Sequence, residues 1–197
     1  MNLLALSTGA VVGIAIAAVV VLIAVIIVCW GIGARNGFVR MKNGCEEAFA
    51  TIDVYLKKRY DLIPNLVETV KGYAKHESET LEAVIAARKT GLAASTTAEK
   101  VAADAAMTRA IVDVKKVAER YPDLKANVNF MDLSRQLSNI ETQLSEQRKY
   151  YNALVKKLNT EKDVFPKSII ASMMHIEKMA YFQLDSDEER KNVTVKF

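Results

Sequence analysis

One apolar stretch, residues 10–30, constrains this chain more than any other feature. It reads AVVGIAIAAVVVLIAVIIVCW, 21 residues without a charged or strongly polar side chain. A helix of that length spans roughly 31 Å, which matches a bilayer hydrocarbon core of about 30 Å. Backbone groups inside lipid must bond within their own segment, so the stretch is predicted to be a helix despite its β-branched residues. We therefore expect a transmembrane anchor over residues 1–34 and a separate domain over residues 35–197.

The flanks of the stretch predict its orientation. Three cations follow it and no Lys or Arg precedes it: Arg35, Arg40 and Lys42. The positive-inside rule then places the N-terminus outside and residues 35–197 in the cytoplasm. The alternative is a cleaved signal peptide, because Gly31 and Gly33 offer small residues at a conceivable cleavage position. The missing basic n-region and the length of the apolar run count against it.

Within the anchor, Gly9, Gly13 and Ala17 form a stripe of small residues on one helix face. Small residues let two membrane helices approach closely, so the stripe predicts self-association and a homo-oligomer. The alternative is that these residues only fill the span, since Gly and Ala are common in membrane helices.

Beyond a short connector containing Gly31, Gly33 and Gly37, apolar residues recur in steps of three and four, which predicts long helices. The first stripe runs over residues 45–74, and its continuation to Arg88 belongs to the same helix or to a second one. The next stripe covers residues 101–121. The third is the most regular: Phe130, Leu133, Leu137, Ile140, Leu144, Gln147, Tyr151, Leu154 and Leu158. A short fourth helix would begin at a Ser168 cap, and residues 193–197 alternate as an extended segment does. The prediction is an all-α fold, an antiparallel bundle of long helices resembling a four-helix bundle.

Loops between these helices are predicted at two places. Residues 92–98 are small and polar, and Thr97 is the expected cap of the helix that follows. The second stripe should end at Tyr121, because the residue before Pro122 is pushed out of the helical region.

The segment around Pro64 is the most informative part of the first stripe, and its candidate interaction or structural residues are Arg59, Tyr60, Asp61, Pro64 and Asn65. A proline inside a helix removes one backbone hydrogen bond and costs about 3 kcal/mol. We expect a kink at which Asp61 caps a restarted helix, supported by an Arg59–Asp61 charge pair. The functional alternative is a bend that shapes a groove or a subunit contact.

The sequence contains no recognisable motif for catalysis or for cofactor binding. The two histidines, His76 and His175, are far apart in the sequence, and neither lies in a metal-binding motif. Cys45 lies on the expected core face, as a small buried apolar residue would. The formal net charge of +4 arises from interleaved acids and bases. We expect no catalytic residues, no cofactor, no metal and no nucleic-acid partner.

Residues 52–77, IDVYLKKRYDLIPNLVETVKGYAKHE, closely resemble the signature of the bacterial LemA family. Further matching segments lie at residues 82–88, 121–127, 165–171 and 189–197. The resemblance implies one N-terminal membrane span, a cytoplasmic antiparallel helical bundle and no enzymatic activity. The family occurs beside membrane proteases and stress genes, and a relative takes part in shaping organelle membranes.

These observations predict a non-enzymatic, membrane-anchored scaffold or assembly protein of the bacterial inner membrane. Its expected partners are the lipid bilayer, further copies of itself and other membrane proteins, with a role in membrane organisation or envelope stress. The alternative is a binding module that presents a peptide or helix groove near Pro64 to a membrane partner such as a protease.

Overall fold

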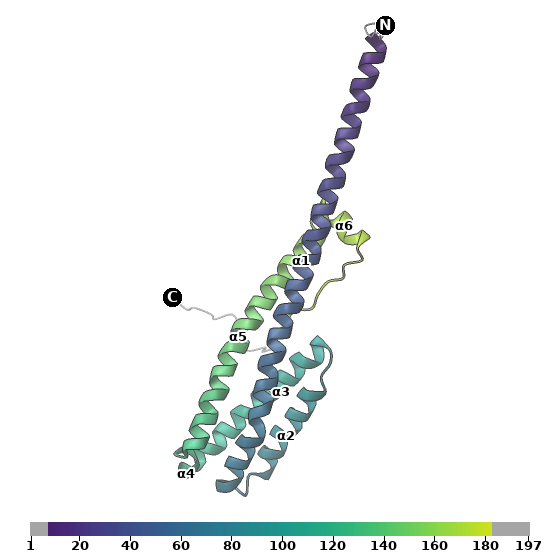
Figure 1. Cartoon of the computed structure of the whole chain (residues 1–197). Helices are drawn as coiled ribbons and strands as arrows, with labels where there is room; N and C mark the ends of the chain where they lie inside the picture. The colour runs from purple at the N-terminus through teal and green to yellow at the C-terminus, as the bar shows by residue number, and fades with distance from the viewer. Residues whose placement is uncertain (1–7, 183–197) are drawn as a thin grey trace, which may run out of the picture. The chain divides into compact units, whose positions relative to one another are not determined.

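A computed structural model describes residues 8–182 of the 197-residue chain. That part contains six helices and no strand, in the order α1 (Thr8–Tyr73), α2 (Ser78–Ala93), α3 (Thr97–Arg120), α4 (Pro122–Lys125), α5 (Val128–Asp163) and α6 (Lys167–Met173) (Figure 1). The predicted all-α fold is confirmed. The extended ending predicted for residues 193–197 lies outside the described residues.

Helix α1 runs without interruption from Thr8 to Tyr73, so the predicted connector at Gly31, Gly33 and Gly37 is wrong. Glycine costs about 1 kcal/mol relative to alanine inside a helix but does not end one by itself. Many helices end at a glycine with positive φ, and no glycine of the described chain has one. The predicted boundary between residues 34 and 35 therefore falls inside α1, and as a domain boundary it stays a prediction.

The chain divides into two compact units. Unit 1 joins the described residues up to Gly44 with Lys157–Lys178, and unit 2 joins Cys45–Lys156 with the described residues from Met179 onward. Unit 1 thus holds the first part of α1, the end of α5 and all of α6. Unit 2 holds the rest of α1, helices α2 to α4 and most of α5.

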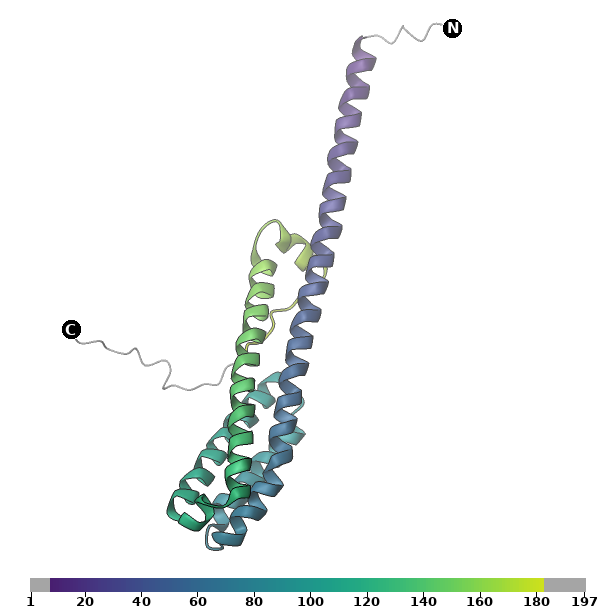
Figure 2. The ribbon, with the colours of Figure 1, turned by 60° about the vertical axis from the view of Figure 1, so that its left-hand side comes forward.

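Unit 2 is a bundle whose neighbouring helices run antiparallel (Figure 2). The ring of Phe49 lies 5.5 Å from that of Tyr151, while Tyr55 donates a hydrogen bond to Gln143. From Phe49 to Tyr55 along α1, the contacting residue on α5 moves back from Tyr151 to Gln143, so the two helices run antiparallel. The core contains the predicted stripes of α1 and α5: Cys45, Ile52, Leu56, Ile63, Val67, Val70, Phe130, Leu133, Leu137, Leu144 and Tyr151 are buried. Ile140 is only half-buried.

The ends of α3 follow local sequence signals. Thr96, not Thr97 as expected, caps its start: the Thr96 hydroxyl accepts from the Glu99 amide, and the Glu99 carboxylate accepts from the Thr96 amide. This reciprocal pair is a capping box, which satisfies two amides at once. The helix ends at Arg120, directly before Tyr121 and Pro122, as predicted. Helix α6 begins at Lys167, so the expected Ser168 cap is wrong.

Unit 1 contains the apolar run. Its large apolar side chains from Val11 to Val28 are 51–62% exposed, and the helix is long and apolar enough to cross a membrane, with a best-window mean hydropathy of 3.5. A helix that is apolar on all sides belongs in a protein core or in lipid. No part of the described chain covers this one, so the run has the length and composition of a membrane-spanning helix.

Candidate functional site

The candidate residues around Pro64 divide into a buried and an exposed set. Arg59 and Tyr60 are only 2% and 4% exposed, whereas Asp61, Pro64 and Asn65 face outward from α1. A buried arginine is unusual, because moving a charge out of water is costly unless it is paired. The partners of Arg59 therefore define the centre of the site.

Arg59 pairs with Asp104 of α3 and not with Asp61, so the predicted local charge pair is wrong. Its Nη1 lies 2.8 Å from Asp104 Oδ1, and Arg148 of α5 binds the second carboxylate oxygen, Oδ2. Asp104 has no exposed surface and Arg148 is 7% exposed. Three helices thus meet at one carboxylate. The physical reason is reach: Asp61 points to solvent, while Asp104 lies on the buried face of α3.

Glu141 and Thr108 complete this buried charge cluster. Glu141 Oε2 lies 3.1 Å from Arg59 Nη1, and its Oε1 lies 3.4 Å from Arg148 Nη1. Arg59 Nη2 also donates to Thr108 Oγ1 at 3.1 Å. Two guanidinium groups therefore face two carboxylates, and the formal charges balance. The Nε atoms of both arginines are buried without a hydrogen-bond acceptor in the described chain.

Burial raises the pKa of Asp104, while Arg148 and then Arg59 act in the opposite direction. A buried ion pair of this kind adds little stability compared with apolar side chains of the same size. Removing one partner is costly, however, because the other charge is then left unpaired in a medium of low polarity. The four charges pair across α1, α3 and α5, so we expect the cluster to help fix the register of these three helices.

Tyr60 and Arg88 explain how α1 passes through Pro64. Proline has no amide hydrogen, so the carbonyl of the residue four positions earlier, Tyr60, loses its usual helical donor. Arg88 Nε of α2 donates to that carbonyl at 2.9 Å. The compensation thus comes from a neighbouring helix. It does not come from Asp61 capping a restarted helix, which was the expectation.

Tyr60 also lies where α1 and α2 approach each other closely. A Cβ on Gly91 of α2 would overlap the end of the Tyr60 ring, so a larger residue at this position would force the ring to move. Burial, followed by the charge of Asp104, raises the pKa of the Tyr60 phenol to about 12. The phenol is consequently neutral at physiological pH and serves as a packing group.

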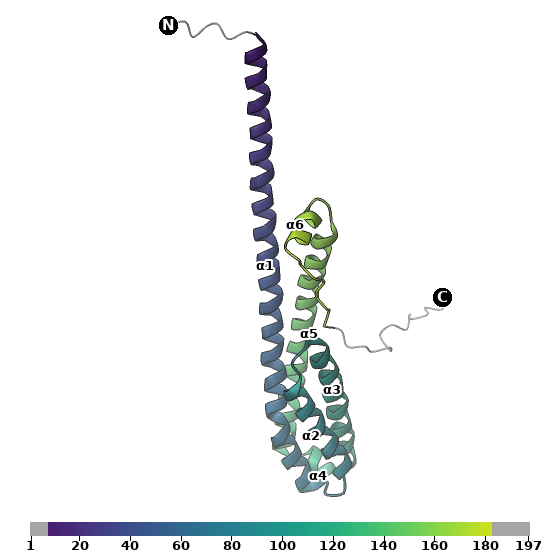
Figure 3. The same ribbon diagram turned by 90° about the vertical axis from the view of Figure 1, so that its right-hand side faces the viewer.

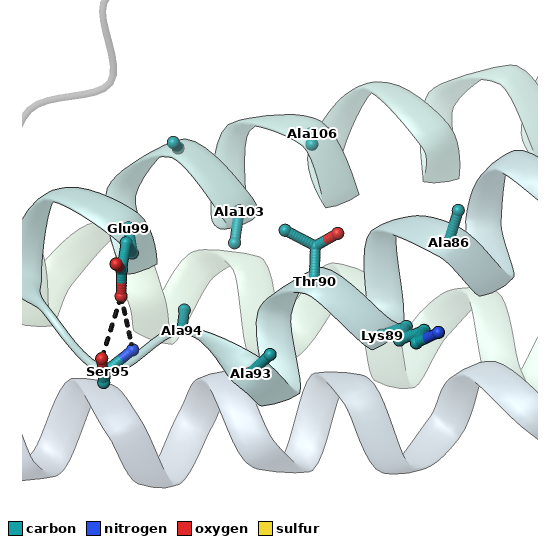
Figure 4. Close-up of a pocket in the computed structure, with 10 residues that line it drawn as sticks. Ala86, Lys89, Thr90, Ala93, Ala94, Ser95, Glu99, Ala103 and Ala106 are labelled. Carbon is teal, nitrogen blue, oxygen red and sulfur yellow. Dashed lines mark hydrogen bonds between the residues drawn. The ribbon is translucent and has the colours of Figure 1, made fainter.

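A groove of about 750 Å³ lies between α2 and α3 (Figure 4). Its walls are short side chains, many of them alanine, and Glu99 and Ser95 hydrogen-bond to each other at one end. None of its lining residues comes from residues 59–65, so this groove is distinct from the one considered near Pro64. Across residues 8–182, no group of three His, Cys, Asp or Glu side chains could hold a metal ion.

The sequence patterns missed Asp104, Arg148 and Glu141, although a signal was present for two of them. Asp104 shares the buried face of α3 with Met107 and Ile111, and Arg148 lies four residues after Leu144 on the α5 seam. A charged residue at a core position of an otherwise apolar stripe is the signal that could have found both.

Fold and site together define a class of protein: an all-α bundle with a buried charge cluster, joined to an apolar helix of membrane-spanning length. The LemA family model matches residues 48–197, and the chain belongs to the LemA family. It is also similar to "Protein LemA" of Metamycoplasma hominis, with 24% identity over 167 residues that cover 82% of this chain and 74% of that protein. The family resemblance of residues 52–77 is thereby confirmed.

Proposed function

We propose that this protein is a non-enzymatic, membrane-anchored scaffold that self-associates in the bacterial inner membrane. The observation that carries the proposal is the exposed apolar run of α1, whose side chains from Val11 to Val28 have no partner in the described chain. A surface this apolar must be covered by lipid or by protein. A scaffold is the role that a lipid anchor and a folded helical bundle support together.

The chemistry of the bundle supports a structural role. Its most deeply buried charged residues, Arg59, Asp104 and Arg148, form ion pairs with one another. Cys45 is fully buried, and burial raises the pKa of its thiol, which lowers its nucleophilicity. Turnover of an ester, phosphate or peptide panel by the purified chain, abolished by Asp104→Asn, would contradict the non-enzymatic role.

Self-association is expected through the small-residue stripe of α1. A Cβ added to Gly9 or Gly13 would meet nothing within 4 Å, so this face is open to a second helix. Gly13→Ile keeps the span apolar but blocks close approach. We expect the detergent-solubilised parent to be an oligomer and Gly13→Ile to be smaller by light scattering. Ala15→Ile on the opposite face is the matched control and should keep the parent mass. A monomeric parent would remove the main support for a scaffold.

The orientation proposal places the bundle in the cytoplasm, because Arg35, Arg40 and Lys42 follow the run. Ser138→Cys puts a thiol on the exposed face of α5, while Cys29 lies in the apolar run and Cys45 is buried. A membrane-impermeant maleimide should label Ser138→Cys only after the cells are lysed. Labelling in intact cells would reverse the orientation.

A further inference from the structure

The turn between α5 and α6 in unit 1 exposes a cluster of large apolar side chains. Val164 and Ile169 are 51% and 53% exposed, and Met173 and Phe165 reach 73% and 76%. These four residues, here called the turn cluster, lie within ten positions of one another. Isolated exposed apolar residues are ordinary, but four large ones within one ten-residue segment favour a contact surface.

Packing within unit 1 places α6, which contains Ile169 and Met173 of the turn cluster, beside the end of the apolar run. A Cβ on Gly31 would lie 3.8 Å from Cδ1 of Ile170, so α6 rests against α1 at that glycine. Gly31 directly follows Trp30, the last residue of the run. Figure 3 shows α6 alongside α1 at this level. If the run crosses a bilayer, α6 lies where the hydrocarbon core gives way to the headgroups.

The polar groups of the turn are tied to one another. Lys167 pairs with Glu161 across the turn, and Lys178 pairs with Asp163 at 2.9 Å. These ion pairs brace both ends of the segment, while the turn cluster between them stays exposed. The result is an apolar tip with a charged base, which is the composition of an interfacial membrane contact.

Formal charge points to the same kind of surface. Outside the run, the described part of unit 1 contains seven cations against three acids: Arg35, Arg40, Lys42, Lys157, Lys162, Lys167 and Lys178 against Glu161, Asp163 and Glu177. This excess equals the +4 formal net charge of the entire chain. Basic residues next to a membrane span are attracted to anionic headgroups.

We propose that the turn cluster is a second membrane contact, in which residues 164–173 insert into the headgroup boundary of the bilayer that α1 spans. The inference rests on the proposed anchoring by α1 and extends it, because it gives the soluble part of the chain a lipid-binding surface of its own. The ligand is a phospholipid surface containing anionic lipid.

The test uses tryptophan fluorescence of the full chain in vesicles of zwitterionic and anionic phospholipid with brominated acyl chains. Trp30 is the single native tryptophan, so Trp30→Phe gives a silent background for Phe165→Trp or, as a second position, Met173→Trp. The matched control is Val128→Trp in the same background, because Val128 is 72% exposed at the start of α5 in unit 2. We expect blue-shifted emission that bromine quenches strongly at positions 165 and 173, and unquenched emission at 128.

The unsubstituted protein, with its native Trp30, distinguishes failure of the turn contact from failure of the proposed anchoring. Quenching of native Trp30 without quenching at 165 or 173 retains the anchor and overturns the turn contact. Loss of quenching at Trp30 as well overturns the anchoring. A third outcome at position 165 is a blue shift that brominated lipid does not quench and that increases with the protein-to-lipid ratio. This result means that a second copy covers the turn cluster, and it also overturns the proposal.

Discussion

The two halves of α1 share one continuous backbone but have opposite side-chain patterns. Residues 10–30 are apolar on every side and exposed, whereas residues 45–73 bury one stripe, including Ile52, Leu56, Ile63 and Val70, and leave the other face polar. Helix propensity cannot tell these halves apart, since both are helical. The difference teaches that the surroundings select the pattern: a bundle needs one apolar face, and lipid needs all of them.

The buried charge cluster adds a second contrast. The anchor excludes charge altogether, while the bundle places two arginines and two carboxylates near its centre. Tolerance of buried charge in the bundle depends on each group having its partner. Substitutions in the charge cluster test this dependence, while substitutions in the apolar core, at Arg88 and Pro64 and at Glu99 should have progressively smaller effects.

The largest expected effect comes from Asp104→Ala, which leaves Arg59 and Arg148 buried without their shared carboxylate. Breaking a buried pair in this way costs about 3 to 5 kcal/mol. Urea unfolding of the detergent-solubilised chain, followed by circular dichroism, measures the loss. Asp61→Ala removes an exposed carboxylate of α1 and should leave the midpoint almost unchanged. Equal midpoints for the two variants would show that the cluster does not set the register of the bundle.

Leu144→Ala tests the apolar stripe of α5, because Leu144 has no exposed surface. Deleting a buried leucine side chain costs about 2 to 5 kcal/mol, depending on how far the cavity collapses. Leu92→Ala is the control, since Leu92 is 51% exposed on α2. If Leu144→Ala unfolds at the parental urea concentration, the seam faces a partner and not the core of unit 2.

Arg88 and Pro64 should be energetically coupled. Arg88→Ala leaves the Tyr60 carbonyl without its donor, which costs about 1 to 3 kcal/mol for a buried unsatisfied group. Pro64→Ala restores the backbone amide that donates to the same carbonyl, so Arg88→Ala should cost much less in that background. A double-mutant cycle by urea unfolding measures the coupling. Additive effects would contradict the compensation of Pro64 by Arg88.

The smallest effect concerns Glu99 in the α3 capping box. The backbone amides of Thr96 and Ser95 donate to its carboxylate and lower its pKa from 4.5 to about 2. A depressed carboxyl pKa stabilises the fold above the unfolded pKa, and this contribution disappears as the pH falls through about 2. NMR titration of the Glu99 carboxyl carbon should show the lowered midpoint. Glu99→Gln should remove this part of the acid dependence, whereas a midpoint near 4.5 would contradict the capping box as described.

Periodicity predicted the fold because the rule it uses is local. The stripe through Phe130, Leu133, Leu137 and Leu144 needs only the helical repeat to be recognised, and all four residues are buried. The glycine connector was wrong for a related reason: Gly31 and Gly33 lower the local helix propensity, but a glycine inside a helix does not end it by itself. Local sequence rules therefore predict where a helix forms better than they predict where it ends.

The site was less predictable because its partners are distant in the sequence. Arg59 was a candidate residue, but its partner Asp104 lies on another helix, and local reasoning chose the nearby Asp61 instead. Arg88, likewise, compensates Pro64 from a different helix. Only the packing of α1 against α2, α3 and α5 brings these groups together. Whether the exposed set of Asp61, Pro64 and Asn65 binds a partner stays a prediction.

The contrast between the two halves of α1 is tested most directly by intact mass and membrane extraction of the chain expressed in bacteria. A run that spans the bilayer should leave the full-length protein of 21.8 kDa in the membrane pellet after alkaline carbonate washing. Integral segments resist this treatment, because the hydrophobic burial of the span does not depend on charge. Release of the chain into the supernatant, or a mass showing cleavage near Gly31 or Gly33, would contradict the anchor.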